Sequence, residues 1–478
     1  MSLIAKLAGS VGAPEPAIRL LLTIIAGYPI AAIYRLVIMH QASKPIHHLF
    51  FALCGSFLCV FNYGFNTYHS LIAIWVTYLL MRLLQKSPKH LVAVNFVFHM
   101  SYLLIGYFFT ESNDYDILWT MPHCVLVLRM IGFGFDVADG QKGKESLSKD
   151  QQETALVDLP SLLELTAFAY FPCAFLVGPQ FPYSRYRRFV DGEFRQCTGF
   201  VQTGVKRMLV GILYLAIRQA GSMVMPESYF LTDDYRNQSF IVRLIYLGIM
   251  GKLTLYKYIS CWLLTEGALM CLGFTYAGMN DKGEADWFGC SNVKLILLET
   301  GNTMGHYVQS FNVNTNHWVA QYIYKRLKFL NNRTISYAAA LGFLAVWHGF
   351  HSGYYMSFLI EYMIVSTEKQ IETVYEKDVL PQYGHILNAS VPFKCLKFAA
   401  LKSYNIIYMG WCLTPFVFLS YSRWISVMSA VNYFGFVYMA IWFLIYKIYQ
   451  FQKRSAMKSN NVLQVQDSKN SENEKKDS

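Results

Sequence analysis

Two short polar stretches, residues 311–318 (FNVNTNHW) and 347–354 (WHGFHSGY), carry the residue types of this chain that are best suited to chemistry. The second stretch lies inside an apolar run that predicts a membrane-spanning helix. Because a histidine at membrane depth is costly unless it has a partner and a purpose, an ionisable group there is a functional-site hypothesis. The chemistry that these residues predict is proton transfer within a membrane-embedded cavity.

His348 is the candidate general base. A buried imidazole is neutral and accepts a proton from a hydroxyl, and such a base typically contributes about 10²–10⁴ in rate. His351 follows three residues later, so we expect it on the same helix face. Gly349 and Gly353 remove side-chain bulk and let a substrate or another helix approach closely. The alternative is a structural histidine that bonds a backbone carbonyl inside a helix bundle.

Asn312, Asn314 and Asn316 are the candidate partners of this histidine. An amide side chain can orient an imidazole, or donate a hydrogen bond to the oxyanion that develops during acyl transfer. The alternative for these three residues is a polar loop or a helix cap.

The composition indicates an integral membrane protein. Hydrophobic residues make up 54% of the 478 residues and charged residues only 15%, which is too few charges to solvate a globular surface of this size. The net charge of +11 comes from basic residues spread over short loops, a pattern typical of positive-inside loops and contacts with anionic lipid heads. No nucleic-acid motif is present. The ten cysteines form no CxxC pair or ligand cluster, so no metal site is predicted.

Apolar runs of about 20 residues predict about eleven crossings of the bilayer. Backbone polar groups must be paired in lipid, so the spans must be helices, and the expected fold is an all-α polytopic membrane bundle. Residues 1–450 are expected to form one membrane-embedded domain. The predicted spans are 17–38, 46–64, 67–86, 91–110, 117–135, 162–179, 203–221, 240–275 (one or two passes), 336–361, 404–420 and 427–449.

Polar segments predict the connections between these spans. Residues 136–160 are rich in glycine, serine and charge and predict an internal loop. Residues 319–333 place apolar side chains at helical spacing among Lys325, Arg326 and Lys328, which predicts an amphipathic helix at the membrane interface.

The C-terminal tail, residues 451–478, is rich in Lys, Ser, Asn and Glu and is expected to be disordered. Lys475 and Lys476 resemble a dilysine signal, which predicts retrieval to the endoplasmic reticulum membrane and a cytosolic tail. Counting crossings back from a cytosolic tail places residues 319–333 in the lumen, whereas their charge favours the cytosol. We therefore expect a re-entrant or unrecognised segment within 366–400.

An ordered set of motifs makes the chain recognisable. FNVNTNHW and WHGFHSGYY, together with the stretches named below, resemble the membrane-bound O-acyltransferase family, and within it the lysophosphatidylcholine acyltransferase branch. The resemblance covers roughly residues 130–450. The additional stretches are DLPSLLE (158–164), FLVGPQF (175–181), the WxxxxN pattern of 287–292, LLET (297–300) and YKRLKFL (324–330).

The resemblance implies a specific reaction and specific residues. His348 matches the catalytic histidine of the family and Asn312 its partner asparagine. The implied reaction transfers a fatty acyl group from acyl-coenzyme A to the free sn-2 hydroxyl of a lysophospholipid in the Lands remodelling cycle. Choline is the preferred head group of this branch, with ethanolamine and serine as lesser acceptors and polyunsaturated chains as favoured donors. Acyl-coenzyme A is a co-substrate, and no separate cofactor is implied.

The fold of the family implies a central tunnel in which both substrates meet. We expect five further side chains from the two polar stretches to line it. The cations of the amphipathic segment are candidates for contact with the phosphates of coenzyme A, with anionic lipid heads as the alternative. The expected tunnel residues are Asn316, Trp318, Trp347, His351 and Tyr354, and the expected phosphate contacts are Lys325, Arg326 and Lys328.

Two other functions remain open at this point. Other branches of the family acylate lysophosphatidylinositol, a sterol or a protein, and the acceptor is the least constrained step. An intramembrane histidine also occurs in transporters, but these predict inverted internal repeats, and the sequence has none. Whether the chain forms a homo-oligomer depends on its lipid-facing surfaces, which the sequence does not specify.

Overall fold

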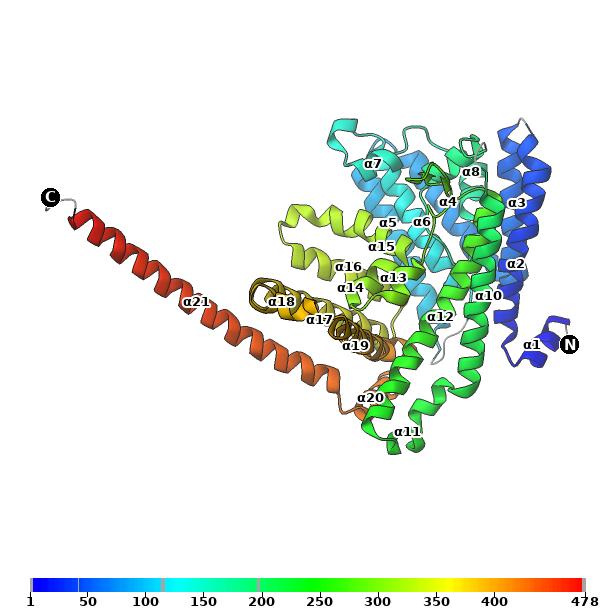
Figure 1. Cartoon of the computed structure of the whole chain (residues 1–478). Helices are drawn as coiled ribbons and strands as arrows, with labels where there is room; N and C mark the ends of the chain where they lie inside the picture. The colour runs from blue at the N-terminus through cyan, green and yellow to red at the C-terminus, as the bar shows by residue number, and fades with distance from the viewer. Residues whose placement is uncertain (1–2, 42, 113–116, 196–197, 475–478) are drawn as a thin grey trace.

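The computed structural model describes residues 3–41, 43–112, 117–195 and 198–474, and it is almost entirely helical (Figure 1). This confirms the all-α fold. The exception within the described residues is a two-stranded antiparallel hairpin of β1 (Gly278–Met279) and β2 (Ala285–Asp286). The helices of the N-terminal half are α1 (Leu3–Val11), α2 (Glu15–Leu36), α3 (Lys44–Tyr63), α4 (Tyr68–Leu84), α5 (Pro88–Thr110), α6 (Thr120–Asp139), α7 (Lys149–Thr154), α8 (Leu162–Ala169), α9 (Tyr183–Val190) and α10 (Phe200–Val224).

The C-terminal half combines long helices with several short ones around two polar turns. They are α11 (Asp233–Asn237), α12 (Phe240–Leu272), α13 (Leu295–Thr300), α14 (Met304–Ser310), α15 (Val313–Val319), η5 (Ala320–Tyr324), η6 (Lys325–Leu330), α16 (Arg333–His348), α17 (Ser352–Val374), η7 (Tyr375–Val379), α18 (Leu380–Ala389), α19 (Val391–Phe418), α20 (Tyr421–Ala430) and α21 (Phe434–Glu474).

Helix α12 organises the bundle. Its 33 residues form one continuous helix across the span predicted at 240–275, and it packs against α10, α2 and α19 (Figure 1). The contact with α19 is made through glycines, since a Cβ added at Gly251 would lie 2.4 Å from the Cα of Gly410. Two glycines facing each other let the helix backbones approach closely, which is a common device in membrane bundles.

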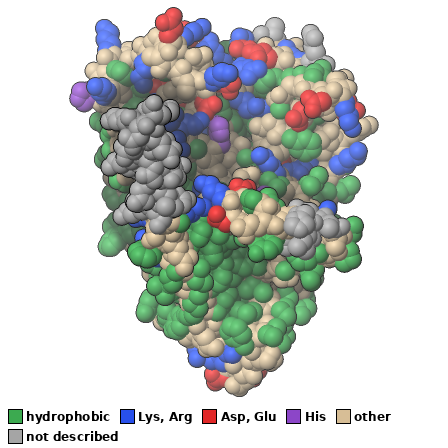
Figure 2. Space-filling model, turned by 60° about the vertical axis from the view of Figure 1, so that its left-hand side comes forward, with side chains coloured by type: hydrophobic (Ala, Val, Ile, Leu, Met, Phe, Trp, Pro, Cys, Tyr) green, Lys and Arg blue, Asp and Glu red, His purple; other side chains and the backbone are tan. Residues whose placement is uncertain are grey.

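Six helical segments in the part of the chain that the structure describes are long and apolar enough to cross a membrane. They coincide with predicted crossings, and they support a protein embedded in the membrane; the full count of about eleven stays a prediction. Figure 2 shows apolar side chains over much of the lower half of one face, with most of the Lys, Arg, Asp and Glu side chains in its upper half and a few at its lower tip. The six segments are Glu15–His40, Lys44–Leu84, Pro88–Thr110, Thr120–Asp139, Phe200–Leu231 and Phe434–Ala456.

The span predicted at 162–179 is wrong. Helix α8 has only eight residues, and the chain then continues in turns that are buried inside the protein. The Arg129 guanidinium of α6 donates hydrogen bonds to the carbonyl oxygens of Phe168, Ala169, Ala174 and Pro179 at 3.1–3.4 Å. Non-helical backbone is tolerated at membrane depth only where protein groups pair it, and here Arg129 does so together with the indole N–H of Trp262, which donates to the Val177 carbonyl at 3.1 Å.

The single span predicted at 336–361 is also wrong. Helix α16 ends at His348, and α17 begins at Ser352. Between them Gly349 has φ +122°, a conformation that side-chain-bearing residues rarely adopt. His348 and His351 therefore lie on either side of a helix break instead of on one helical face.

Two further segments differ from the expected spans. The predicted 427–449 crossing is divided between α20 and α21. Within 366–400 the chain forms the end of α17, then η7 and α18, and the KCLKFAAL stretch is the first part of the long α19. The direction in which these helices cross the membrane stays a prediction.

The last helix runs on to Glu474 and projects away from the other helices (Figure 1). The disorder expected for residues 451–478 stays a prediction, and Lys475 and Lys476 lie outside the described residues.

Candidate active site

His348 lies on the wall of an internal cavity of about 570 Å³. Its imidazole is surrounded by the rings of Trp347, Tyr354, Phe358 and Phe416, with centroid separations of 4.7–5.6 Å. Within the described residues neither ring nitrogen has a hydrogen-bond partner. The ring is thus held by packing, and its nitrogens remain available to a molecule in the cavity.

The end of α16 that carries this histidine is fixed by two hydrogen bonds from other helices. Tyr107 of α5 donates its hydroxyl to the Trp347 carbonyl at 3.2 Å, and the indole N–H of Trp347 donates to the Cys124 carbonyl of α6 at 2.9 Å. A carbonyl freed by the helix end is satisfied in this way. The helix break ends the regular hydrogen-bond ladder, but these two hydrogen bonds hold the end of α16, and with it His348, in place.

Asn312 lines the same cavity from another direction. It precedes α15 and adopts a left-handed conformation with φ 50°, which asparagine tolerates better than most residues. Its Oδ1 accepts a hydrogen bond from Asn292 Nδ2 at 3.2 Å. Because its oxygen is engaged, the amide N–H donors of Asn312 are the part left to face a ligand.

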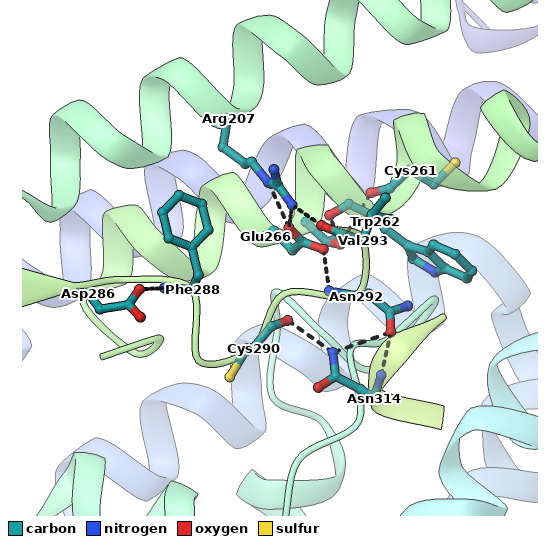
Figure 3. Close-up of polar contacts among 11 residues, drawn as sticks. Arg207, Cys261, Trp262, Glu266, Asp286, Phe288, Cys290, Asn292, Val293 and Asn314 are labelled. Atoms are coloured by element: carbon teal, nitrogen blue, oxygen red, sulfur yellow. Dashed lines mark hydrogen bonds and ion pairs between the residues drawn. The ribbon is translucent and has the colours of Figure 1, made fainter. Parts of the chain in front are cut away.

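A buried network of polar side chains supports Asn312. Arg207 of α10 pairs with Glu266 of α12 at 2.6 Å, and Glu266 Oε1 accepts the backbone N–H of Asn292 at 2.6 Å. Asn292 Oδ1 then accepts the backbone N–H and the side-chain N–H of Asn314, at 3.0 and 3.2 Å (Figure 3). This polar network links α10 and α12 to the loop that carries Asn312.

The charged groups of this polar network are buried, but they pair with each other and have further hydrogen-bond partners. Glu266 and Asn292 are at most 2% exposed and Arg207 is 9% exposed. The Arg207 guanidinium also donates to the Val293 carbonyl at 2.8 Å, so the ion pair has hydrogen-bond partners on both sides (Figure 3). Breaking such a pair by removing one partner is strongly destabilising, which makes it a firm support for the neighbouring loop.

The three asparagines of the first polar stretch have different roles. Asn312 and Asn316 line the cavity, whereas Asn314 does not. Asn316 donates to the Val308 and Phe311 carbonyls at 2.8 and 3.0 Å and thereby closes the turn between α14 and α15. The alternative of a polar loop or helix cap stays open: Asn314 and Asn316 lie inside α15, and Asn312 is at its N-cap position without a capping hydrogen bond from its side chain.

Four of the five expected tunnel residues line the cavity: Asn316, Trp347, His351 and Tyr354. Trp318 does not. It is 6% exposed and packs in a hydrophobic core against Phe343 and Tyr322, on the far side of α15. Helical spacing brings Trp318 near the other residues of its stretch but does not specify which face meets the cavity.

The cations expected to meet coenzyme A are partly engaged inside the protein. Lys325 forms an ion pair with Asp150, and Arg326 forms a two-point pair with the buried Asp139. The hydrogen bond from Lys325 lowers the pKa of Asp150 below its usual range. Lys328 is exposed. The positive charge that this segment offers to a phosphate is therefore carried mainly by Lys328.

The segment expected as an interfacial helix is built into the body of the protein. Residues 313–330 form one helical stretch, α15–η5–η6, whose Tyr322 donates to Asp136 of α6 at 2.8 Å. Its Gln321 donates to Thr154 of α7 at 3.2 Å. The basic end is helical, as predicted, but it docks on the 136–160 region as well as carrying surface charge.

Two carboxyl groups of the cavity were not singled out from the sequence. Glu111, directly after α5, contacts His351 Nε2 at 3.1 Å and accepts the Phe350 N–H at 3.2 Å. Glu361 of α17 also lines the cavity, one helical turn beyond Phe358. Glu361 could have been noticed as an acidic residue in an apolar run, but the pairing of Glu111 depends on a contact between distant segments.

Comparison with known proteins identifies the family. The family model described as MBOAT, the membrane-bound O-acyltransferase family, matches residues 104–411. The chain is 65% identical to a Drosophila melanogaster protein named lysophospholipid acyltransferase 5, over 94% of this chain and 90% of that one. It is 40% identical to a human protein of the same name, over 91% and 89% of the two chains, and 33% identical to one from Caenorhabditis elegans, over 94% and 95%.

The protein therefore belongs to the membrane-bound O-acyltransferase family. The family and the similarity over nearly the whole chain make it a membrane-embedded O-acyltransferase, as its motifs predicted. His348 and Asn312 lie on the wall of one cavity, which is the candidate site for this activity.

Proposed function

We propose that this protein is a lysophospholipid acyltransferase that moves a fatty acyl group from acyl-coenzyme A to the sn-2 hydroxyl of a lysophospholipid. The observation that carries the proposal is the placement of His348 and Asn312 on one largely apolar cavity. A cavity with a mostly apolar lining suits the apolar part of a lipid ligand. The names of the relatives, lysophospholipid acyltransferase 5, support the acceptor class.

His348 acts as the general base in this proposal. A ring nitrogen takes the proton of the sn-2 hydroxyl as its oxygen attacks the thioester carbonyl. The C–S bond then breaks, and the coenzyme A sulfur leaves as a thiolate that recovers the proton from the imidazolium. The products are the diacyl phospholipid and coenzyme A, and no covalent acyl-enzyme is formed.

Asn312 stabilises the oxyanion that the attack creates. Its Oδ1 is occupied by the bond from Asn292, so its amide N–H donors point the positive end of the dipole toward the ligand. A preorganised donor in a water-poor cavity lowers the energy of developing negative charge, and loss of one such donor typically costs about 10²–10³ in rate. Holding both substrates in one cavity supplies the proximity contribution.

The two substrates reach the reaction centre from opposite ends. The cavity is lined by Tyr324 and Tyr337 near the basic η6 segment and by Glu111 near the helix break. Helix α6 runs between these two ends of the cavity. Its last residue, Asp139, pairs with Arg326 of η6, and Glu111 lies in the connection that precedes α6. Acyl-coenzyme A, a polyanion, fits the basic end, with Lys328 as the freest cation for its phosphates.

For the acceptor we propose lysophosphatidylcholine first, followed by the ethanolamine and serine lysolipids, with polyunsaturated acyl chains preferred. The endoplasmic reticulum membrane is the proposed location. These assignments follow from the family branch that the motifs resemble.

The test is an acyl-transfer assay on the purified protein in lipid nanodiscs. Lysolipids with choline, ethanolamine, serine, glycerol and inositol head groups are each offered with arachidonoyl- and oleoyl-coenzyme A, and diacyl products are measured by mass spectrometry. We expect transfer to the choline lysolipid to be fastest. Transfer to a sterol or a protein with none to any lysolipid would overturn the proposal.

A further inference from the structure

The helix break at Gly349 lies against a second hollow of about 560 Å³ that opens beside the main cavity. Its lining within the described residues consists of Phe108, Glu111, Ser112, Phe350 and His351. Three of these residues, Glu111, Ser112 and His351, also line the main cavity. The Glu111–His351 pair therefore stands at the boundary between the outer hollow and the space that His348 faces.

The chemistry of the outer hollow suits a bulky cation. It combines one carboxyl group with two aromatic rings, Phe108 and Phe350, which are 73% and 47% exposed. Aromatic faces and a carboxylate are the groups that recognise quaternary ammonium ions, through cation–π attraction and charge. The nearest basic partner of the carboxyl is an imidazole, which is a weaker competitor than a lysine or arginine would be.

The inner side of the boundary offers hydrogen-bond donors. His351 presents an imidazole to both spaces, and its Nε2 lies 3.1 Å from Glu111 Oε1. It also lies only three residues from His348 along the chain, which limits the separation of their Cα atoms to about 10 Å. A glycerol carbon, a phosphate and a short amino-alcohol span a comparable distance between the sn-2 oxygen and the ammonium of a zwitterionic lysolipid.

We propose that Glu111 and His351, with the Phe108 and Phe350 rings, form the head-group site for a zwitterionic lysolipid. Glu111 receives the ammonium group, the two rings cover it, and the single N–H of His351 is shared between Glu111 and the phosphate. The inference rests on the proposed acyl transfer to lysophospholipids and adds the residues that select the head group. This site lies at the end of the cavity opposite to the basic η6 segment, so the two charged substrates do not compete for it.

A purely structural role for Glu111 is the competing explanation. Its carboxyl accepts the Phe350 N–H at 3.2 Å, and a Cβ at Gly349 would lie 3.3 Å from its Oε1, so it also braces the helix break. A brace would affect the position of His348 and thus the transfer to every acceptor equally. A head-group site affects only acceptors that carry a cation.

The experiment compares Glu111→Gln with the unmodified protein in nanodiscs, using choline and glycerol lysolipids with one acyl-coenzyme A. The substitution keeps an acceptor for the Phe350 N–H and removes the charge. We expect KM for the choline lysolipid to rise about tenfold, equivalent to ~1.4 kcal/mol, with kcat and the glycerol lysolipid kinetics nearly unchanged. Glu111→Asp, which keeps the charge, should recover part of the choline preference.

Glu361→Gln is the matched comparison, because it removes a carboxyl from the same cavity on α17. An equal loss of kcat for both acceptors in Glu111→Gln would overturn the proposal in favour of the brace. A shift in head-group preference for Glu361→Gln instead of Glu111→Gln would also overturn it. If the unmodified protein acylates neither lysolipid, the proposed function fails and not merely the head-group assignment.

Discussion

Asn292 is predicted to act on the reaction through Asn312. Replacing it with alanine removes the donor to Asn312 Oδ1 at 3.2 Å and the acceptor for two N–H groups of Asn314 at 3.0 and 3.2 Å. The backbone bonds from Asn292 to Glu266 and to the Val313 N–H remain. Asn312 then loses the contact that fixes which end of its amide faces the ligand.

The expected losses of stability and of rate follow from these three hydrogen bonds. At about 0.5–1.5 kcal/mol each, their loss lowers the free energy of unfolding by about 1.5–4.5 kcal/mol. Complete loss of an oxyanion donor costs about 10²–10³ in kcat, so a donor that is present but no longer oriented should cost about 10- to 100-fold. KM for both substrates should change little, because the interaction is made in the transition state.

A double-mutant cycle is the assay. Rates of acyl transfer at saturating substrates are measured for Asn292→Ala, Asn312→Ala and the double variant. Two residues that act as a unit show non-additive effects, so the double variant should transfer acyl groups as fast as Asn312→Ala alone. Asn314→Ala is the control, since it removes bonds to Asn292 and Cys290 but has no side chain on the cavity.

Additive losses in the double variant would refute this reasoning, because they would mean that Asn292 affects the rate by a route that does not include Asn312. A fall in kcat for Asn314→Ala as large as that for Asn292→Ala would refute it as well. The rate effect would then follow from general loosening of the loop.

Three further predictions concern other charged groups. Glu266→Gln leaves Arg207 buried without its partner and should lower the stability in detergent by about 3–5 kcal/mol, whereas the double variant with Arg207→Met should recover much of that loss in a thermal unfolding assay. Lys328→Glu should raise KM for acyl-coenzyme A about three- to tenfold in a salt-dependent way, and an unchanged KM would remove Lys328 from the phosphate contacts. Arg129→Met leaves four buried carbonyls without their donor and should greatly reduce the yield of folded protein, while the matched Arg82→Met, on the exposed side of α4, should not.

Local sequence signals were sufficient for the class of fold, and they singled out two polar stretches that the structure brings to one cavity. Apolar runs of bilayer length correspond to the six spanning segments, since hydropathy reflects the solvent that a helix meets. The two polar stretches proved to face one cavity through His348 and Asn312. Polar side chains in an otherwise apolar segment are costly, which is why they marked the site without any three-dimensional information.

The differences between the predicted and the observed helices all depend on contacts between segments that are distant in the sequence. Residues 162–179 are apolar enough to span, but Arg129 from α6 stabilises them as turns. Residues 336–361 are mostly apolar, but Glu111 accepts the Phe350 N–H and the Leu419 carbonyl, directly after α19, accepts the Gly353 N–H at 2.9 Å, so the helix breaks at Gly349. The supporting polar network joins Arg207 to Glu266, 59 residues apart, and Glu266 to Asn292, 26 residues apart, and residue spacing alone does not reveal such contacts.

The central claim is that the His348 imidazole removes the proton of the attacking hydroxyl. Single-turnover acyl transfer by His348→Ala, with saturating lysolipid and acyl-coenzyme A, tests it most directly, with the exposed His90→Ala at the start of α5 as control. The claim predicts a rate lower by about 10²–10⁴ with both substrates still bound, and an unchanged rate for the control. Transfer by His348→Ala at the rate of the unmodified protein would contradict it.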